Sequence, residues 1–225
     1  IAIAQLSIKA GEKIAILGRN GAGKSTLLHM LCGMQTPQQG QIQLDGIDLH
    51  LLDPADVRRD VSLLSQNAQL FFGTIRENLM LGAPMASDDA LIWALQLTGA
   101  WDFVQQKPQG LDHLILEGGV GFSGGQRQLL LLTRLILSNP QTVLLDEPTA
   151  WLDEVCERQL IERLKPWLAQ RTLIIATHRR AVLDLVDRIL VMHDGRIVKD
   201  DVKDQILSAS QSKIIVPRQG VAHNA

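Results

Sequence analysis

The chain has 225 residues, enough for a sizeable hydrophobic core in one or two compact lobes. Its net charge of −2 gives no electrostatic basis for binding nucleic acid or an anionic membrane surface, and we expect no nucleic-acid partner. No apolar run approaches the roughly 20 residues of a membrane-spanning helix. Cys32 and Cys156 form neither a metal-binding nor a disulfide pattern, so we expect two buried free thiols and a reducing compartment.

The first 67 residues predict short strands around one glycine-rich loop. The predicted strands cover residues 1–8, 14–17, 41–44 and 61–64. The glycine-rich loop follows the second of these strands, and a helix begins near Leu27. Asp45-Gly46 predicts a hairpin turn after the third strand.

Residues 68–139 contain no clear strand. We expect a helix over 88–97 after the N-cap residue Ser87, a short one over 101–106, and a long one that Ser123 caps and that continues to about Ser138. We interpret this segment as a helical lobe inserted into an α/β core.

The C-terminal part returns to alternating strands and helices. The predicted strands cover 143–145, 172–176, 189–192 and 196–198, and a helix with Pro166 near its end covers 154–169. The strands lack polar alternation, which is typical of a parallel sheet covered on both faces. We therefore predict an α/β core over 1–67 and 140–207, a helical subdomain over 68–139, and a flexible tail over 208–225.

The glycine-rich loop fits the phosphate-binding pattern of glycine, four residues, glycine, lysine, and serine or threonine. Its strand–loop–helix context lets loop N–H groups and a helix N-terminus point at phosphate oxygens. Lys24 is expected to reach the β- and γ-phosphates, and the Ser25 hydroxyl to bind Mg²⁺. The candidate ATP-binding residues are Gly18, Asn20, Gly21, Ala22, Gly23, Lys24, Ser25 and Thr26. The alternative is a glycine-rich turn that binds nothing.

Two further patterns add chemistry. Asp146 and Glu147 follow a buried strand, so they are expected at the carboxyl edge of the sheet beside the phosphate loop. Asp146 suits Mg²⁺, and Glu147 could orient or activate water, although a plain strand end is the alternative. The turn from Phe122 to Gln126 is a second anion-binding turn without a lysine. A second turn of this kind is explained if it closes over a nucleotide bound to another copy of the chain.

The order of these motifs resembles the nucleotide-binding domain of ABC transporters, over residues of about 10 to 200. The run 123–128 is similar to the family signature, and the run 146–153 is similar to its Walker B motif and D-loop. Gln66 lies where the family has its Q-loop, and His178 lies where it has its switch histidine. The resemblance implies an α/β P-loop NTPase core, with a parallel sheet flanked by helices, an N-terminal β portion, and an inserted helical subdomain that carries the signature.

The resemblance also implies a head-to-tail pair of copies with two ATP molecules between them. The implied catalytic residues are Glu147, His178 and Gln66, and the implied Mg²⁺ ligands are Ser25, Gln66 and Asp146. Each ATP would contact the signature residues Ser123, Gly124, Gly125 and Gln126 of the other copy. Asp153 would link the two sites across the interface. Taken singly, Gln66 and His178 could be surface residues, and Asp153 could be an N-cap.

The subfamily is indicated by four further runs. Residues 71–79 and 117–121 are similar to exporters, and 120–128 with 177–180 most resemble bacterial type I protein secretion ATPases. This implies ATP-driven export of a protein across the inner membrane, with the domain on its cytoplasmic side. The implied partners are an N-terminally fused membrane domain, a periplasmic adaptor and an outer-membrane channel. Exporters of peptides, bacteriocins, lipids or drugs are the alternative, and less favoured are a non-transport ABC ATPase and a catalytically dead cassette.

The chain departs from the family pattern at three places. Phe122 replaces the usual signature leucine, and Trp151 replaces a small D-loop residue without an explanation from the sequence. The family's adenine-stacking aromatic residue would fall before Ile1. We therefore expect this chain to bind nucleotide weakly on its own.

Overall fold

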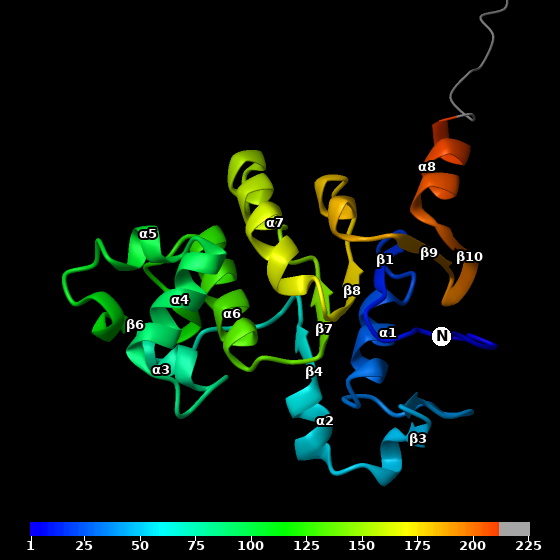
Figure 1. Cartoon of the computed structure of the whole chain (residues 1–225), viewed down its shortest axis with the longest axis horizontal. Coiled ribbons are helices and arrows are strands. Elements are labelled where there is room, and N and C mark those ends of the chain that lie inside the picture. The colour runs from blue at the N-terminus through cyan, green and yellow to red at the C-terminus, as the bar shows by residue number, and fades with distance from the viewer. Residues whose placement is uncertain (212–225) are drawn as a thin grey trace, which may run out of the picture.

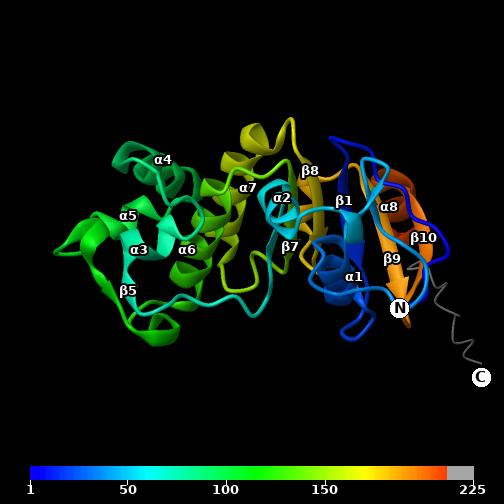
Figure 2. The same cartoon turned by 90° about the horizontal axis from the view of Figure 1, so that it is seen from below.

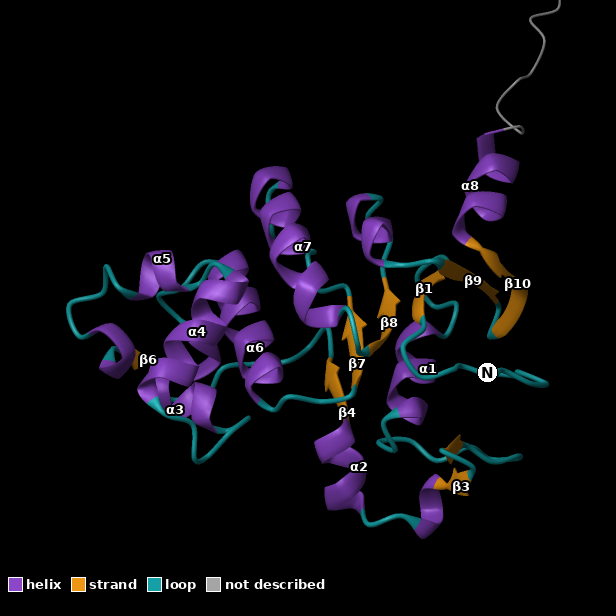
Figure 3. Cartoon of the chain, viewed as in Figure 1, coloured by secondary structure: helices purple, strands orange, loops and turns teal. Residues whose placement is uncertain are grey.

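A six-stranded sheet forms the centre of the computed structural model, which describes residues 1–211 (Figures 1 and 3). In spatial order the strands are β10 (Arg196–Val202), β9 (Arg188–His193), β1 (Lys13–Leu17), β8 (Thr172–Ala176), β7 (Thr142–Asp146) and β4 (Val61–Leu64). All neighbours pair in parallel except β9 and β10, which form an antiparallel hairpin. The predicted parallel α/β fold is confirmed.

The central strands β1, β7 and β8 bury both of their faces, as their continuous apolar sequences predict. In β1, Ile14 and Ile16 pack in one cluster with Leu27 and Leu28 of helix α1 (Lys24–Leu31). The intervening Ala15 packs in a second cluster, with helix α7 (Glu154–Leu168) and much of the helical lobe. Helices α1 and α7 consequently lie on opposite sides of the sheet (Figures 1 and 2). Both faces are removed from water, which is the main stabilising contribution.

A helical lobe occupies one end of the molecule (green in Figure 1). It contains α3 (Ile75–Met80), α4 (Asp88–Thr98), α5 (Trp101–Val104) and α6 (Gly124–Leu137). Capping follows the sequence, because Ser87 and Ser123 each accept a hydrogen bond from a backbone N–H at the start of their helices. The expectation of no strand in this lobe is wrong. Two short strands, β5 (Gly73–Thr74) and β6 (Leu114–Ile115), pair across about 40 residues, which local sequence patterns do not reveal.

The remaining elements connect these parts. A hairpin of β2 (Gln43–Leu44) and β3 (Ile47–Asp48) turns at Asp45-Gly46, both with positive φ, as predicted. The other helices are α2 (Pro54–Asp60), α8 (Lys203–Gln211), and the 3-10 turns η1 (Leu49–Leu51), η2 (Gly110–Asp112), η3 (Glu117–Gly119) and η4 (Ala181–Leu185). Helix α7 continues through Pro166 to Leu168.

The predicted strand over residues 1–8 is wrong. Ile3, Leu6 and Ile8 are half-buried against the core, so the apolar pattern is real. These residues form no strand ladder, and the Ala2 N–H instead donates to the Gly195 carbonyl at 2.7 Å. An apolar stripe can thus pack on a core without a neighbouring strand.

Two smaller expectations also differ from the structure. Cys156 is exposed, whereas Cys32 is buried as expected. The expected tail over 208–225 begins too early, because α8 continues to Gln211, and residues 212–225 lie outside the described residues. Among residues 1–211, no helix has both the length and the apolarity needed to span a bilayer.

Candidate nucleotide-binding site

Four neighbouring parallel strands end at the same edge of the sheet. The residues that directly follow β1, β8, β7 and β4 are Gly18, Thr177, Glu147 and Ser65. Because carboxyl ends of parallel strands meet at one edge, the glycine-rich loop, the segment before His178, the acidic pair and the segment before Gln66 lie along one line. Residues far apart in sequence share this line only through strand order.

The phosphate loop requires its glycines for two physical reasons. Gly21 and Gly23 have φ of 80° and 98°, a left-handed conformation that disfavours side chains. A Cβ atom on Gly18 would lie 2.5 Å from the Met192 carbonyl oxygen of β9, so a larger residue would force the backbone to shift. The Gly195 N–H donates to the Ala22 carbonyl at 3.1 Å, which fastens the loop to the β9–β10 turn.

The start of α1 is open toward the loop. Gly23 is its N-cap residue, and no side chain in the described part of the chain caps its first turn. Helix N-terminal N–H groups without a capping side chain form a ready anion-binding site. Lys24 is buried, and its ammonium donates to the Gly18 and Arg19 carbonyls at 2.9 and 3.3 Å. Ser25 and Thr26 follow as half-buried residues, whereas Asn20 and Gly21 are exposed.

Glu147 and His178 form the one direct contact between candidate catalytic side chains in the described residues. His178 Nδ1 lies 2.9 Å from Glu147 Oε1, with side-chain exposures of 70% for His178 and 10% for Glu147. The Glu147 N–H donates to the Ala176 carbonyl of β8 at 2.9 Å, and its φ is 50°. A left-handed glutamate at a strand end costs about 1–3 kcal/mol, so the surrounding structure imposes this geometry.

Unpaired buried oxygens show that this edge suits Mg²⁺ and nucleotide. Within residues 1–211, Glu147 Oε2 and Thr149 Oγ1 are buried and have no hydrogen-bond partner. Asp146, which ends β7, is also buried, with 3% exposure. Buried oxygens require a partner, and a cation or polar ligand supplies one. With the buried Lys24 ammonium, the donor set fits a nucleotide phosphate and a hard cation.

Gln66 and Asp153 are predicted site residues whose side chains contact no other candidate residue among those described. Gln66 follows β4 at the same edge but is exposed, and none of the hydrogen bonds found within the described residues involves its side chain. Asp153 Oδ1 accepts hydrogen bonds from Val155 and Cys156 N–H at 2.9 Å, which caps α7 and holds the pKa of the Asp153 carboxyl below its usual range.

The signature turn lies against the D-loop and away from the phosphate loop. Ser123 and Gln126 form a reciprocal capping box, with bonds of 3.0 and 3.2 Å, at the start of α6. Cβ atoms on Gly124 and Gly125 would each lie 3.1 Å from an atom of Trp151. Helices α6 and α1 stand apart with β7 between them in both views (Figures 1 and 2). One chain therefore presents two separate glycine-containing turns, each at the start of a helix.

Sequence reasoning missed two polar residues of this region, Thr149 and Arg179. Thr149 lies in the Walker B run but received no role, although its hydroxyl is buried and unpaired among the described residues. Arg179 follows the switch histidine and donates hydrogen bonds to D-loop carbonyls. The available signal was position, because Thr149 lies within a recognised motif and Arg179 directly follows one.

Comparison with known proteins finds relatives among ABC transporters. The family model described as ABC transporter matches residues 2–150. The chain is 40% identical over 203 residues to an ATP-dependent lipid A-core flippase of Methylobacillus flagellatus, covering 90% of this chain and 35% of that protein. It is 38% identical over 207 residues to an alpha-hemolysin translocation ATP-binding protein of Escherichia coli, covering 92% and 29%.

A third relative and a solved structure extend the same pattern. A toxin RTX-III translocation ATP-binding protein of Actinobacillus pleuropneumoniae is 39% identical over 202 residues, covering 90% of this chain and 28% of that protein. The ATP-bound structure of a bacterial Atm1-family ABC exporter superposes with a TM-score of 0.85 at 29% identity, over 94% of this chain and 38% of that one. The chain thus spans about a third of the length of these proteins. It belongs to the ABC transporter family.

Proposed function

We propose that this chain binds ATP with Mg²⁺ and hydrolyses it at the carboxyl edge of the sheet to drive export. The observation that carries the proposal is the Glu147–His178 contact of 2.9 Å, on the same edge as the Lys24 loop. Loop N–H groups and Lys24 bind the phosphates. Ser25, Asp146 and Gln66 would hold Mg²⁺, which supplies charge neutralisation at the phosphate oxygens when bound.

Glu147 acts on the attacking water in this proposal. Its Oε1 is held by His178, and its buried Oε2 is left free to accept a proton from water. The His178 ring orients Glu147 through their 2.9 Å contact. Because the His178 side chain is mostly exposed, it remains accessible to the γ-phosphate. Catalysis then comes mainly from positioning and electrostatics, which is typical of phosphoryl transfer.

The second nucleotide-binding half comes from another copy. The turn Ser123–Gln126 has helix-start N–H groups but no cation, and it begins α6, which stands apart from α1, the helix that follows the phosphate loop (Figure 2). A head-to-tail pair places the signature turn of each copy over the nucleotide of the other, with Asp153 at the interface. The chain then supplies one part of each of two composite sites.

The second proposed partner is a membrane domain fused to the N-terminus of this chain, and an apolar hollow with two exposed phenylalanines is its proposed contact surface. A hollow of about 440 Å³ is lined by Cys32, Val57, Leu64, Leu135 and neighbouring residues, which come from both the proposed core (1–67 and 140–207) and the proposed helical subdomain (68–139). Phe71 and Phe72 beyond β4 are 59% and 67% exposed. Such exposed apolar residues mark an interaction surface. We propose that the chain lies at the cytoplasmic face of the inner membrane, as the exporter resemblance implies.

A protein is the favoured cargo, as in type I secretion. Several relatives at 38–39% identity are named as translocation ATP-binding proteins for hemolysin, leukotoxin or RTX toxin. Such a system would also require a periplasmic adaptor and an outer-membrane channel. A lipid is the second candidate, because a lipid A-core flippase is 40% identical.

ATP hydrolysis by the purified chain, measured against protein concentration, tests the catalytic proposal. We expect specific activity to rise with concentration, and Glu147→Gln to lower kcat by about 100-fold or more, since it removes the general base. Glu162→Gln, an exposed substitution on α7, is the matched control and should leave kcat unchanged. Full activity in Glu147→Gln would overturn the assignment.

Exchange of domains tests the cargo. The chain would replace the corresponding domain of the alpha-hemolysin translocator and, separately, of the lipid A-core flippase. Secreted hemolysin and growth of flippase-depleted cells are the two measurements. We expect activity in the hemolysin chimera, and growth supported only by the flippase chimera would favour the lipid candidate.

A further inference from the structure

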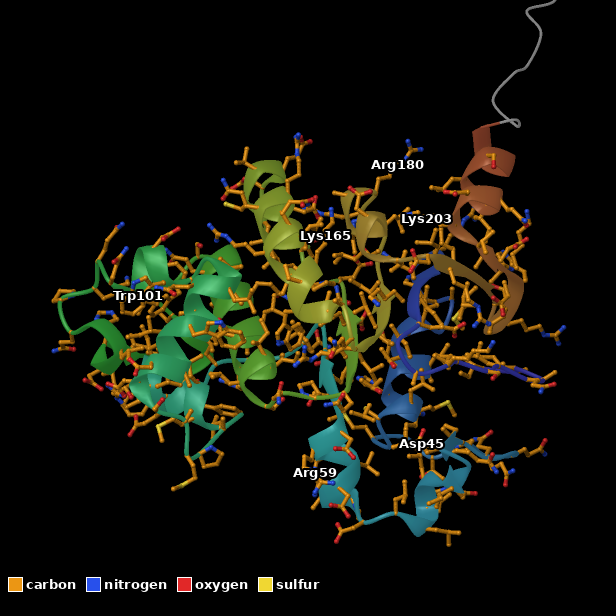
Figure 4. The ribbon with its side chains drawn as sticks, viewed as in Figure 1. Asp45, Arg59, Trp101, Lys165, Arg180 and Lys203 are labelled. Atoms are coloured by element: carbon orange, nitrogen blue, oxygen red, sulfur yellow. The ribbon has the colours of Figure 1, made fainter. Side chains whose placement is uncertain are left out.

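Arg179, the residue after the switch histidine, turns back onto the D-loop. Its Nη1 donates to the Leu152 carbonyl at 3.0 Å, and its Nη2 donates to the Ala150 carbonyl at 3.1 Å. These carbonyls lie on either side of Trp151, so one guanidinium holds the loop on both sides of that residue. The next residue, Arg180, is exposed and points away from the body of the molecule (Figure 4).

A buried carboxylate holds Arg179 in this position. Arg179 Nη1 lies 3.4 Å from Glu157 Oε2, and the side-chain exposures are 25% for Arg179 and 6% for Glu157. Glu157 comes from the first turn of α7, which begins directly after the D-loop. A planar guanidinium can serve two carbonyls and one carboxylate at once, whereas a lysine ammonium lacks this forked geometry. The contact is therefore specific for arginine.

Trp151 lies against the signature turn. A Cβ atom on Gly124 would be 3.1 Å from Trp151 Cε3 and 3.2 Å from its Cδ2, so the indole packs directly on the backbone of the first residue of α6. Trp151 is nevertheless 67% exposed. Its bulk, unexplained by the family pattern, fills space beside Gly124 that a small residue would leave open.

We propose that Arg179 and Trp151 are positioning residues that join the Glu147–His178 pair to the signature turn of the same chain. The proposal rests on the proposed ATPase function. Arg179 is covalently adjacent to His178, it holds the D-loop at both sides of Trp151, and Trp151 packs on Gly124. In a head-to-tail pair, the Glu147–His178 pair serves one nucleotide and the signature turn serves the other. The Arg179–Trp151 contact chain thus sets the two half-sites of one copy relative to each other.

Arg179→Lys tests the first part of this contact chain. The assay is ATP hydrolysis by the full chain, at protein concentrations where wild-type specific activity has reached its plateau. We expect kcat to fall about 10- to 100-fold, because misplacement of the reacting groups slows chemistry, and KM for ATP to change less than about twofold. Arg180→Lys is the adjacent control. Arg171→Lys, which alters an arginine bound to the Pro140 carbonyl at 3.1 Å, controls for loss of any arginine–carbonyl contact.

Trp151 variants test whether the contacts act as a unit. Trp151→Ala should lower kcat, and Trp151→Phe should retain most of it because a ring still covers Gly124. If the two residues act through one another, Arg179→Lys/Trp151→Ala is no more than about twofold slower than the slower single variant. Multiplied losses in the double variant indicate independent effects and overturn the proposal.

The outcomes separate this inference from the proposed function. Wild-type kcat in both Arg179→Lys and Trp151→Ala, with Glu147→Gln inactive, overturns only the Arg179–Trp151 contact chain. Full activity in Glu147→Gln overturns the catalytic assignment and the inference together. Circular dichroism reports folding of each variant. If Arg179→Lys does not fold, the exposed Trp151→Ala and its Phe counterpart decide the result.

Discussion

Gly18→Ala tests the packing of the phosphate loop against the sheet. The new Cβ atom would lie 2.5 Å from the Met192 carbonyl oxygen, which is 0.9 Å inside the 3.4 Å lower limit of ordinary contact. The opposing atom belongs to the backbone of β9, so no side-chain rotation relieves the contact. Overpacking of this kind costs about 1–3 kcal/mol. We expect the free energy of unfolding to fall by that amount.

The same substitution should affect catalysis, because the loop or the β9–β10 hairpin has to shift. A displacement of about 1 Å near reacting groups can cost on the order of 100-fold in rate. Urea unfolding measures stability, and steady-state ATP hydrolysis measures kcat/KM. We expect kcat/KM to fall by at least about tenfold.

Gly11→Ala is the matched control for this prediction. Gly11 precedes the other end of β1, has φ of 81°, and has no neighbouring atom within 4 Å of the Cβ position. Alanine there costs roughly 1–2 kcal/mol through its left-handed backbone. Stability should fall as in Gly18→Ala, while kcat/KM stays at the wild-type value. Wild-type stability and activity in Gly18→Ala would refute the packing argument.

Three further predictions concern stability and thiol chemistry. The Arg188 guanidinium donates hydrogen bonds to the Asp200 carboxylate and lowers its pKa. The ion pair therefore stabilises the fold above about pH 4, and this stabilisation is lost as Asp200 is protonated at lower pH. The melting temperatures of Asp200→Asn and wild type should converge below about pH 4. Thr133→Val should cost about 1–3 kcal/mol in urea unfolding, because the Thr98 hydroxyl, 2.8 Å from that of Thr133 in the core, loses a partner; no loss would contradict this. A hydrogen bond to the Asp153 carboxylate raises the pKa of the Cys156 thiol, so Asp153→Asn should move the midpoint of its labelling rate to lower pH, and an unchanged midpoint would contradict this.

Local sequence patterns were sufficient for most helices and central strands. Apolar runs predicted β1, β7 and β8 because both sheet faces are buried, and Ser87 and Ser123 predicted helix starts because their side chains cap the first turn. These are interactions over a few residues. Patterns that depend on a distant partner failed, as at residues 1–8 and at the β5–β6 pair.

By itself, the sequence determined the order of the phosphate-binding and acidic motifs and the family to which they belong. It did so because the required residue types are contiguous. Only the tertiary structure decided that Glu147 meets His178 and that Arg179 reaches the D-loop, since these contacts depend on β7 and β8 being neighbours. It also decided that Trp151 packs on Gly124, a contact between two loops joined by no local rule. These contacts form because the order of the strands and the close packing of two loops bring distant residues together. The spacing of residues along a short stretch of sequence does not specify either.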